Sequence, residues 1–125
     1  MKNLLLFVFA GAFLPLHAQY LNIKIDSGQA YGECSIIMNP KNTNQIVGGS
    51  NLNNVYTSTD GGATWMKQEL FSVSDGGDPT GAVDTNGIFY FAHLQSGQGA
   101  NNCYSSSNGG VNWSTVGQFG VTSVK

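Results

Sequence analysis

Two stretches of this sequence repeat one pattern of turn residues, and that repeat constrains the fold more than any other feature. Residues 58–65 read STDGGATW and residues 106–113 read SSNGGVNW, so Trp65 and Trp113 stand 48 positions apart. Adjacent glycines supply the φ > 0 angles that other residues adopt only at a cost. Asp60 precedes them, where a carboxylate accepts hydrogen bonds from turn N–H groups. The pattern predicts two hairpins of the same design.

Short apolar and β-branched stretches surround both turns, and no 3.6-residue periodicity survives among the many glycines and asparagines. The predicted strands are 34–38, 45–49, 54–58, 65–70, 80–84, 88–93, 102–106 and 113–116. A repeat of about 40–50 residues made of short strands is typical of β-propeller blades. The sequence therefore predicts an all-β fold: two four-stranded antiparallel blades at about 33–72 and 78–117. A truncated third blade would follow, up to residue 125, because a propeller needs at least about four blades to close.

The octet at 58–65 matches the pattern S-x-D-x-G-x-T-W at every specified position. It resembles the Asp box, or bacterial neuraminidase repeat, of sialidase-like β-propellers, and the likeness covers about residues 32–116. The second copy departs from the pattern at Asn108 and Asn112. The resemblance implies a box between the third and fourth strands of each blade. It gives a structural role in the turns to Ser58, Asp60, Gly62, Thr64 and Trp65, and to Ser106, Asn108, Gly110 and Trp113.

The first 18 residues have the features of a secretory signal peptide. A basic start precedes the apolar run Leu4–Leu16, and Ala18 is a small residue suited to cleavage. The run is shorter than the roughly 20 residues of a membrane span. We expect cleavage after Ala18 and a secreted, periplasmic or cell-surface protein; the alternative is a buried N-terminal helix. Residues 19–32 are predicted to be a lead-in whose strand at 20–25 completes the last blade of a closed propeller.

Composition limits the partners of the chain. Its five cations are all lysines, against seven acids, and the formal net charge is −2. No basic patch of the kind that binds nucleic acid is present. Metal-ligand spacings and phosphate-binding loops are also missing, so no metal or cofactor is predicted. Cys34 and Cys103 are predicted to be free buried thiols, with a disulfide in an exported chain as the alternative.

Strand direction predicts which chemical groups meet. The first strand of each blade starts at the end opposite the boxes, so Glu33, Asp78, His93 and the loop 94–101 should share one end. Asp75 lies in the loop before Asp78. Two acids spaced by glycines can serve acid–base chemistry or hold a cation, or simply form a polar loop. His93 can bind a ligand or be structural. Sialidase-like enzymes, under the resemblance, have their active site at this end.

Sialidases hold the substrate carboxylate with three arginines and use a Tyr–Glu pair as nucleophile. Because this chain has no arginine, that clamp cannot be carried over to any of its residues. The resemblance implies a secreted, glycan-directed propeller, of which this chain is an N-terminal piece that is inactive alone. One alternative is a non-catalytic extracellular propeller that binds glycans or cell-surface proteins. Another is a glycosidase of a different Asp-box family that uses acids such as Asp78.

Two blades without their neighbours should leave apolar faces uncovered. We expect such faces to carry Ile36, Met38, Val47, Phe89 and Phe91. Repeat arrays gain much of their stability from contacts between neighbouring repeats. Large exposed apolar patches favour association. The sequence therefore predicts that residues 19–125 alone are aggregated, oligomeric or loosely folded.

Overall fold

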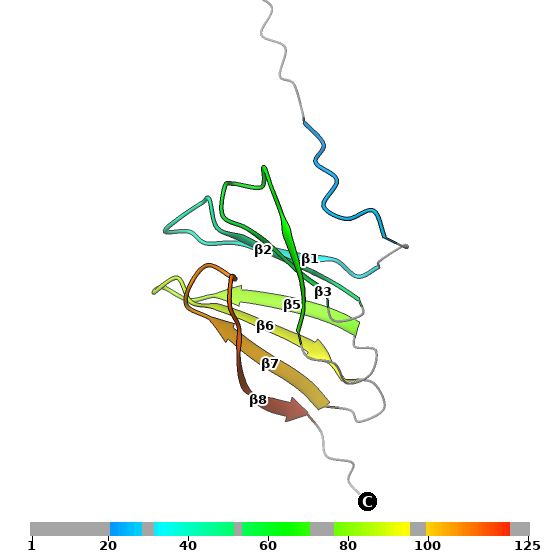
Figure 1. Cartoon of the computed structure of the whole chain (residues 1–125). Helices are drawn as coiled ribbons and strands as arrows, with labels where there is room; N and C mark the ends of the chain where they lie inside the picture. The colour runs from blue at the N-terminus through cyan, green and yellow to red at the C-terminus, as the bar shows by residue number, and fades with distance from the viewer. Residues whose placement is uncertain (1–20, 29–31, 52–53, 71–76, 96–99, 121–125) are drawn as a thin grey trace, which may run out of the picture.

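A computed structural model describes residues 21–28, 32–51, 54–70, 77–95 and 100–120. These residues form two four-stranded antiparallel sheets, in the orders β1-β2-β3-β4 and β5-β6-β7-β8 (Figure 1). The first sheet contains β1 (Ser35–Met38), β2 (Ile46–Ser50), β3 (Asn54–Ser58) and β4 (Met66–Glu69). The second contains β5 (Gly77–Val83), β6 (Phe89–Leu94), β7 (Ala100–Ser106) and β8 (Ser114–Gly120). Within these described ranges, no helix has the length and apolarity needed to span a bilayer.

Eight strands were predicted, and the described residues form eight, with β3 at its predicted bounds. The largest differences lie in the second sheet, where β5 starts at Gly77 and β8 continues to Gly120. Register shifts between Gly77 and Thr80 and between Cys103 and Tyr104 mark irregular pairing in those hairpins. At each shift, one strand has an extra residue that is left unpaired. The ladder is interrupted there and pairing continues on the other side of the shift.

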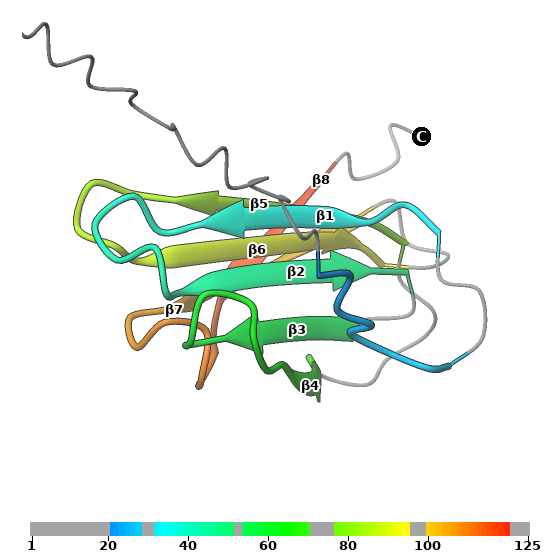
Figure 2. The same ribbon diagram turned by 90° about the horizontal axis from the view of Figure 1, so that it is seen from above.

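The lead-in has a different structure from the predicted strand. Residues 21–27 form no strand, and Tyr20 lies outside the described residues. Figure 2 shows this segment, in blue, passing over β2 and β3 on the side away from the second sheet. The described residues do not test its predicted pairing with the last blade of a closed propeller, so that part stays a prediction.

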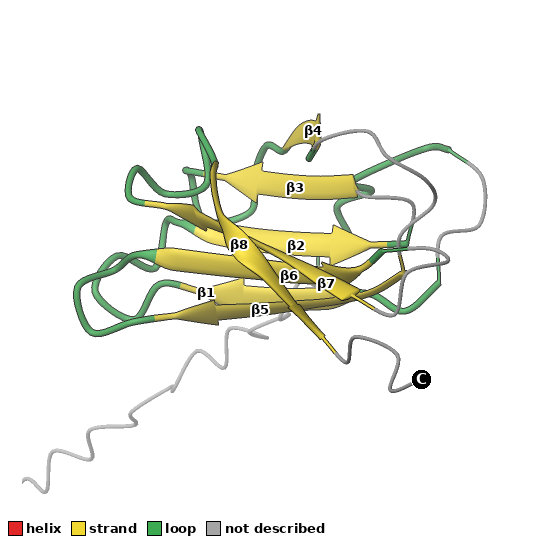
Figure 3. Cartoon of the chain, turned by 90° about the horizontal axis from the view of Figure 1, so that it is seen from below, coloured by secondary structure: helices red, strands yellow, loops and turns green. Residues whose placement is uncertain are grey.

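The two sheets stack face to face, as the views from opposite sides show (Figures 2 and 3). The strands β1 and β2 lie against β5. Phe91 of β6 packs over Gly49 of β2, where any Cβ would collide with its ring. Glycine at position 49 therefore makes room for the aromatic side chain that joins the sheets. The core between them contains Val47, Val55, Leu70, Phe89, Phe91 and Tyr104, with Ile37, Val83 and Trp113 packed at its border.

The prediction of uncovered faces was half right. Ile36 and Met38 are 67% and 49% exposed, as expected. Val47, Phe89 and Phe91 were wrongly assigned, because they are at most 2% exposed and lie between the two sheets. A strand with apolar residues on both of its faces does not reveal from its sequence which face meets a neighbouring sheet.

Candidate functional site

The first turn is closed by side chains of the octet itself. The Ser58 hydroxyl accepts the Gly62 N–H at 2.8 Å and donates to Asp60 Oδ1 at 2.8 Å. The other Asp60 oxygen accepts the Thr64 hydroxyl at 2.6 Å, and Trp65 Nε1 donates to the Gly62 carbonyl at 2.9 Å. Hydrogen bonds from the hydroxyl and N–H of Thr64, then from the Ser58 hydroxyl, lower the pKa of Asp60 to about 2. Both carboxylate oxygens of Asp60 therefore accept hydrogen bonds from within the turn.

The second turn repeats the hydrogen bonds centred on the serine, with an amide in place of the carboxylate. Ser106 accepts the Gly110 N–H at 2.9 Å and donates to Asn108 Oδ1 at 2.9 Å. The same amide oxygen accepts the Asn112 N–H at 2.9 Å. Trp113 differs from its counterpart in the first turn, since its buried Nε1 has no partner and its ring meets Phe91 edge-on at 6.1 Å. All nine box residues therefore lie at the turn end of the sheets.

The opposite end brings two acidic residues together. The Asp78 N–H points to Glu33 Oε2 at 3.4 Å and to the Asn51 side-chain oxygen at 3.2 Å. Glu33 and Asp78 both have left-handed backbones, with φ of 56° and 50°. Such angles are costly outside glycine, and they often mark functional positions. The geometry therefore singles out Glu33, Asn51 and Asp78, which we call the acidic end.

The two carboxyl groups of the acidic end affect each other's ionisation. A hydrogen bond with Glu33 raises the pKa of Asp78, and the negative charge of Glu33 adds to that effect. The same hydrogen bond, with a further one to Asn51, lowers the pKa of Glu33. The contact therefore favours the charged form of Glu33 and the neutral form of Asp78.

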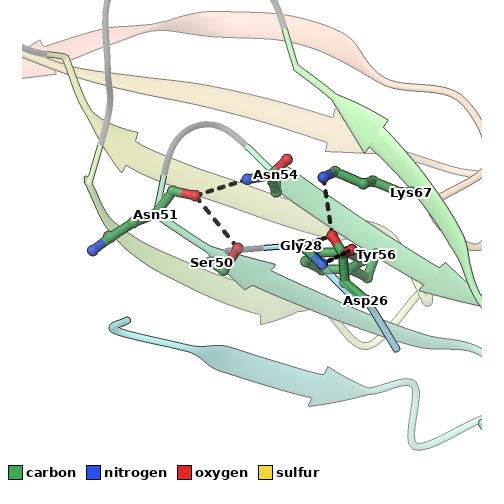
Figure 4. A network of polar contacts seen from close by, with 7 residues as sticks. All are labelled: Asp26, Gly28, Ser50, Asn51, Asn54, Tyr56 and Lys67. Carbon is green, nitrogen blue, oxygen red and sulfur yellow. Dashed lines mark hydrogen bonds and ion pairs between the residues drawn. The ribbon is translucent and has the colours of Figure 1, made fainter. Parts of the chain in front are cut away.

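Asn51 was missed by the sequence reasoning. It directly follows β2, and its backbone carbonyl accepts the Asn54 side-chain amide at 2.9 Å and the Ser50 hydroxyl at 3.4 Å (Figure 4). An asparagine at a strand end was the only available signal, and many turns carry that signal.

His93 was expected at the same end as the acids, and the register places it there, since its neighbour Leu94 pairs with Gly77, next to Asp78. The His93 side chain is 3% exposed and stacks on the Tyr104 ring at 5.7 Å between centroids. Its Nδ1 lies 3.1 Å from the Leu94 carbonyl, and its Nε2 has no partner among the described residues. No described hydrogen bond or ion pair joins His93 to Glu33 or Asp78, so it belongs to the packing between the sheets. Asp75 lies outside the described residues.

A second polar cluster ties the lead-in to the first sheet, and sequence reasoning missed it. Asp26 accepts the Tyr56 hydroxyl at 2.8 Å, the Lys67 ammonium at 2.9 Å and the Gly28 N–H at 2.8 Å (Figure 4). The Lys67 contact, followed by the Gly28 N–H, holds the pKa of Asp26 well below its usual range. The contacts of Asp26 with Tyr56 and Lys67 span 30 and 41 positions, so no local sequence pattern indicates them.

A hollow of about 570 Å³ lies between the lead-in and the first sheet. Its apolar lining includes Ile23, Ile25, Ile36 and Tyr56, and Gly48 leaves room at its base. Cys34 also lines the hollow. It is exposed, which corrects the prediction of a buried thiol, while Cys103 is half-buried and both cysteines are free. Cys34 is exposed because no second layer covers this side of β1.

Chemically, the acidic end suits hydrogen bonding better than hydrolysis by a pair of acids. Glycosidases separate their two carboxyl groups by about 5–5.5 Å or about 6.5–9.5 Å. Glu33 and Asp78 are in direct hydrogen-bond contact, which is closer than either arrangement. Among the described residues, no group of three or more His, Cys, Asp or Glu side chains could hold a metal ion.

No protein-family model matches this chain, and no curated protein matches its sequence. The class of the protein therefore rests on its own structure, which is all-β with two similar four-stranded antiparallel sheets.

Proposed function

We propose that this chain supplies two blades of a secreted, sialidase-like β-propeller, and that the acidic end is its glycan-facing surface. Support for blades comes from the repeated design: each sheet has the order of a simple meander and a box turn between its last two strands. Support for glycan recognition comes from the acidic end, where carboxyl and amide groups from both sheets converge. Such groups accept and donate hydrogen bonds to sugar hydroxyls.

The single observation that carries the proposal is the meeting of Glu33, Asn51 and Asp78 across the two sheets. A glycan spanning this end would contact both blades at once, as ligands do where elements converge. The left-handed backbones of Glu33 and Asp78 hold the acids in place and would be costly without a use.

We further propose that this chain alone does not hydrolyse sialosides. A sialic acid carries a carboxylate, and arginine is the residue best suited to bind it in a bidentate manner. The chain has no arginine, and its acidic end is negatively charged near Glu33. A non-catalytic glycan-binding propeller is the second candidate function. The direct contact between the two carboxyl groups favours that candidate, because it leaves no space for a reacting sugar atom between them.

The test is binding of a panel of neutral and sialylated oligosaccharides to the chain, followed by NMR, together with a fluorogenic sialoside assay. We expect binding of neutral glycans, at least tenfold weaker in Glu33→Gln and Asp78→Asn. Glu69→Gln is the matched control, since it removes an exposed charge from β4 and leaves the acidic end intact. Binding that is unaffected by the two variants, or absent from a folded chain, would contradict a glycan-facing acidic end. Turnover of the sialoside would contradict the proposed inactivity.

A further inference from the structure

The two sheets are built from equivalent positions, and the equivalence follows from their strand registers. Ser58 and Ser106 open the two boxes, and each pairs across its hairpin with a residue of the second strand. The other residue pairs of these strand ladders then match the remaining residues on one face of the first sheet with those on one face of the second. The equivalent residues of the first and second sheets are Ile36 and Gly81, Met38 and Val83, Ile46 and Phe89, Gly48 and Phe91, and Tyr56 and Tyr104.

In the second sheet, this face is buried against the first sheet. Phe89, Phe91 and Tyr104 are at most 3% exposed and lie in the core. In the first sheet, the equivalent face has no sheet over it among the described residues. We call it the open face and define it by Ile36, Met38, Ile46, Gly48 and Tyr56. Ile36 and Met38 are exposed, whereas Ile46 and Tyr56 are buried and the lead-in crosses the face, where Asp26 accepts the Tyr56 hydroxyl. The exposed residues and the hollow at Gly48 lie where the second sheet has its intersheet core.

The same comparison applies to the opposite faces. The first sheet covers the second with Ile37, Val47, Gly49 and Val55. The equivalent positions of the second sheet are Ala82, Tyr90, Ala92 and Cys103. They form, with Leu94 and Phe119, what we call the far face. Leu94 and Phe119 are 38% and 54% exposed, so no described residue covers these two apolar positions, whereas Ala92 is buried.

We propose that the far face of one copy of this chain docks on the open face of a second copy, repeating the contact that already joins the two sheets. The association is head-to-tail, because two different faces meet. A head-to-tail contact closes into a ring when its rotation fits and otherwise continues as a chain of copies. A ring of such copies would contain an even number of blades.

The facing side chains differ in size from those of the contact within one copy. The open face has Gly48 where the second sheet has Phe91, which leaves the hollow. On the far face, Tyr90 and Ala92 are larger than their equivalents Val47 and Gly49, whereas Ala82 and Cys103 are smaller than Ile37 and Val55. A tightly packed interface needs this kind of exchange, since unfilled volume costs stability. The lead-in borders the hollow through Ile23 and Ile25 and adds apolar surface to the open face.

The proposed contact also places two thiols near each other. Within one copy, a Cβ at Gly49 would lie 3.0 Å from Pro79. Cys34 is equivalent to Pro79, and Ala92 is equivalent to Gly49. In the docked pair, Cys34 of one copy therefore faces Ala92 of the next, whose strand partner is Cys103. Both thiols are free in the single chain.

A thiol-specific cross-linker on the full chain tests the contact directly. We expect ladders of cross-linked copies from the wild type and none from Cys34→Ser or Cys103→Ser alone. A mixture of these two variants should give one cross-linked dimer, because each supplies the thiol that the other lacks. Cross-linking within Cys103→Ser alone would indicate open faces meeting each other and would overturn the proposal. A mixture that gives no dimer would also overturn it.

Sedimentation of charged variants gives an independent test. Ile36→Lys disables the open face and Phe119→Lys disables the far face, so each variant alone should be monomeric at concentrations where the wild type associates. Their equimolar mixture should form a dimer through the two intact faces. Thr85→Lys, in an exposed turn between β5 and β6, is the charge-matched control and should associate as the wild type does. A wild type that stays monomeric at tenfold higher concentration refutes the proposal.

Discussion

Substituting the second glycine of each box separates the cost of the turn from the cost of packing between the sheets. Gly62 and Gly110 hold the same place in the two turns, with φ of 92° and 87°. A Cβ at Gly62 would meet nothing closer than 3.6 Å. A Cβ at Gly110 would lie 2.7 Å from Val47 and 2.9 Å from the Thr57 hydroxyl. Gly62 therefore lies where an added methyl group has room, whereas Gly110 packs against the first sheet.

The expected losses of unfolding free energy differ accordingly. A residue with a Cβ in a left-handed conformation costs about 1–2 kcal/mol, which should be the full effect of Gly62→Ala. Gly110→Ala bears the same cost plus overpacking, worth about 1–3 kcal/mol. It also strains the 2.9 Å hydrogen bond from Thr57 to the Gly110 carbonyl, worth about 0.5–1.5 kcal/mol. We therefore expect a loss of roughly 3–5 kcal/mol for Gly110→Ala, a large share of the about 5–15 kcal/mol typical of a domain.

Urea unfolding followed by tryptophan fluorescence measures both losses. The measurement is best made in a Phe119→Lys background, so that association of copies does not add to stability. Equal losses for the two variants would refute the reasoning, since they would show that the second turn does not pack on the first sheet.

Four further predictions concern the two boxes, the lead-in and the leader. Asp60→Ala should melt earlier than the wild type at neutral pH. Since the pKa of Asp60 is lowered to about 2, its stabilising effect is present above the unfolded pKa of about 3.9 and disappears as the pH falls through about 2; melting curves whose difference does not shrink over that range would contradict this. Asn108→Asp should leave the neutral melting temperature unchanged and add the same acid sensitivity, which a pH series of melts would detect. Asp26→Asn should free the lead-in, so that trypsin cuts after Lys24 faster than in the wild type; equal rates would show that the contacts of Asp26 do not hold it. N-terminal sequencing of exported protein should begin at Gln19, and a retained Met1 would contradict the signal-peptide prediction.

Much of the acidic end followed from the sequence through strand direction. Alternating antiparallel strands put the start of β1 and the start of β5 at the end away from the boxes, so Glu33 and Asp78 were expected together. Their shared hydrogen bond and left-handed backbones could not be foreseen. Both depend on how the first sheet sits against the second, and side-chain contacts across 45 positions leave no trace in local composition. The burial of His93 has the same origin, since β6 faces the first sheet on that side.

The sequence by itself determined the two turns and the strands they join. Ser58, Asp60 and Gly62 close the first turn with bonds no more than four positions long, so the octet carries its own geometry. The tertiary structure alone decided which face of each sheet is buried. Ile36 and Ile37 are neighbours of equal apolarity in β1, yet one is exposed and the other borders the core. Burial requires a partner surface, and the partner of the inner face is a second sheet some 40 residues away.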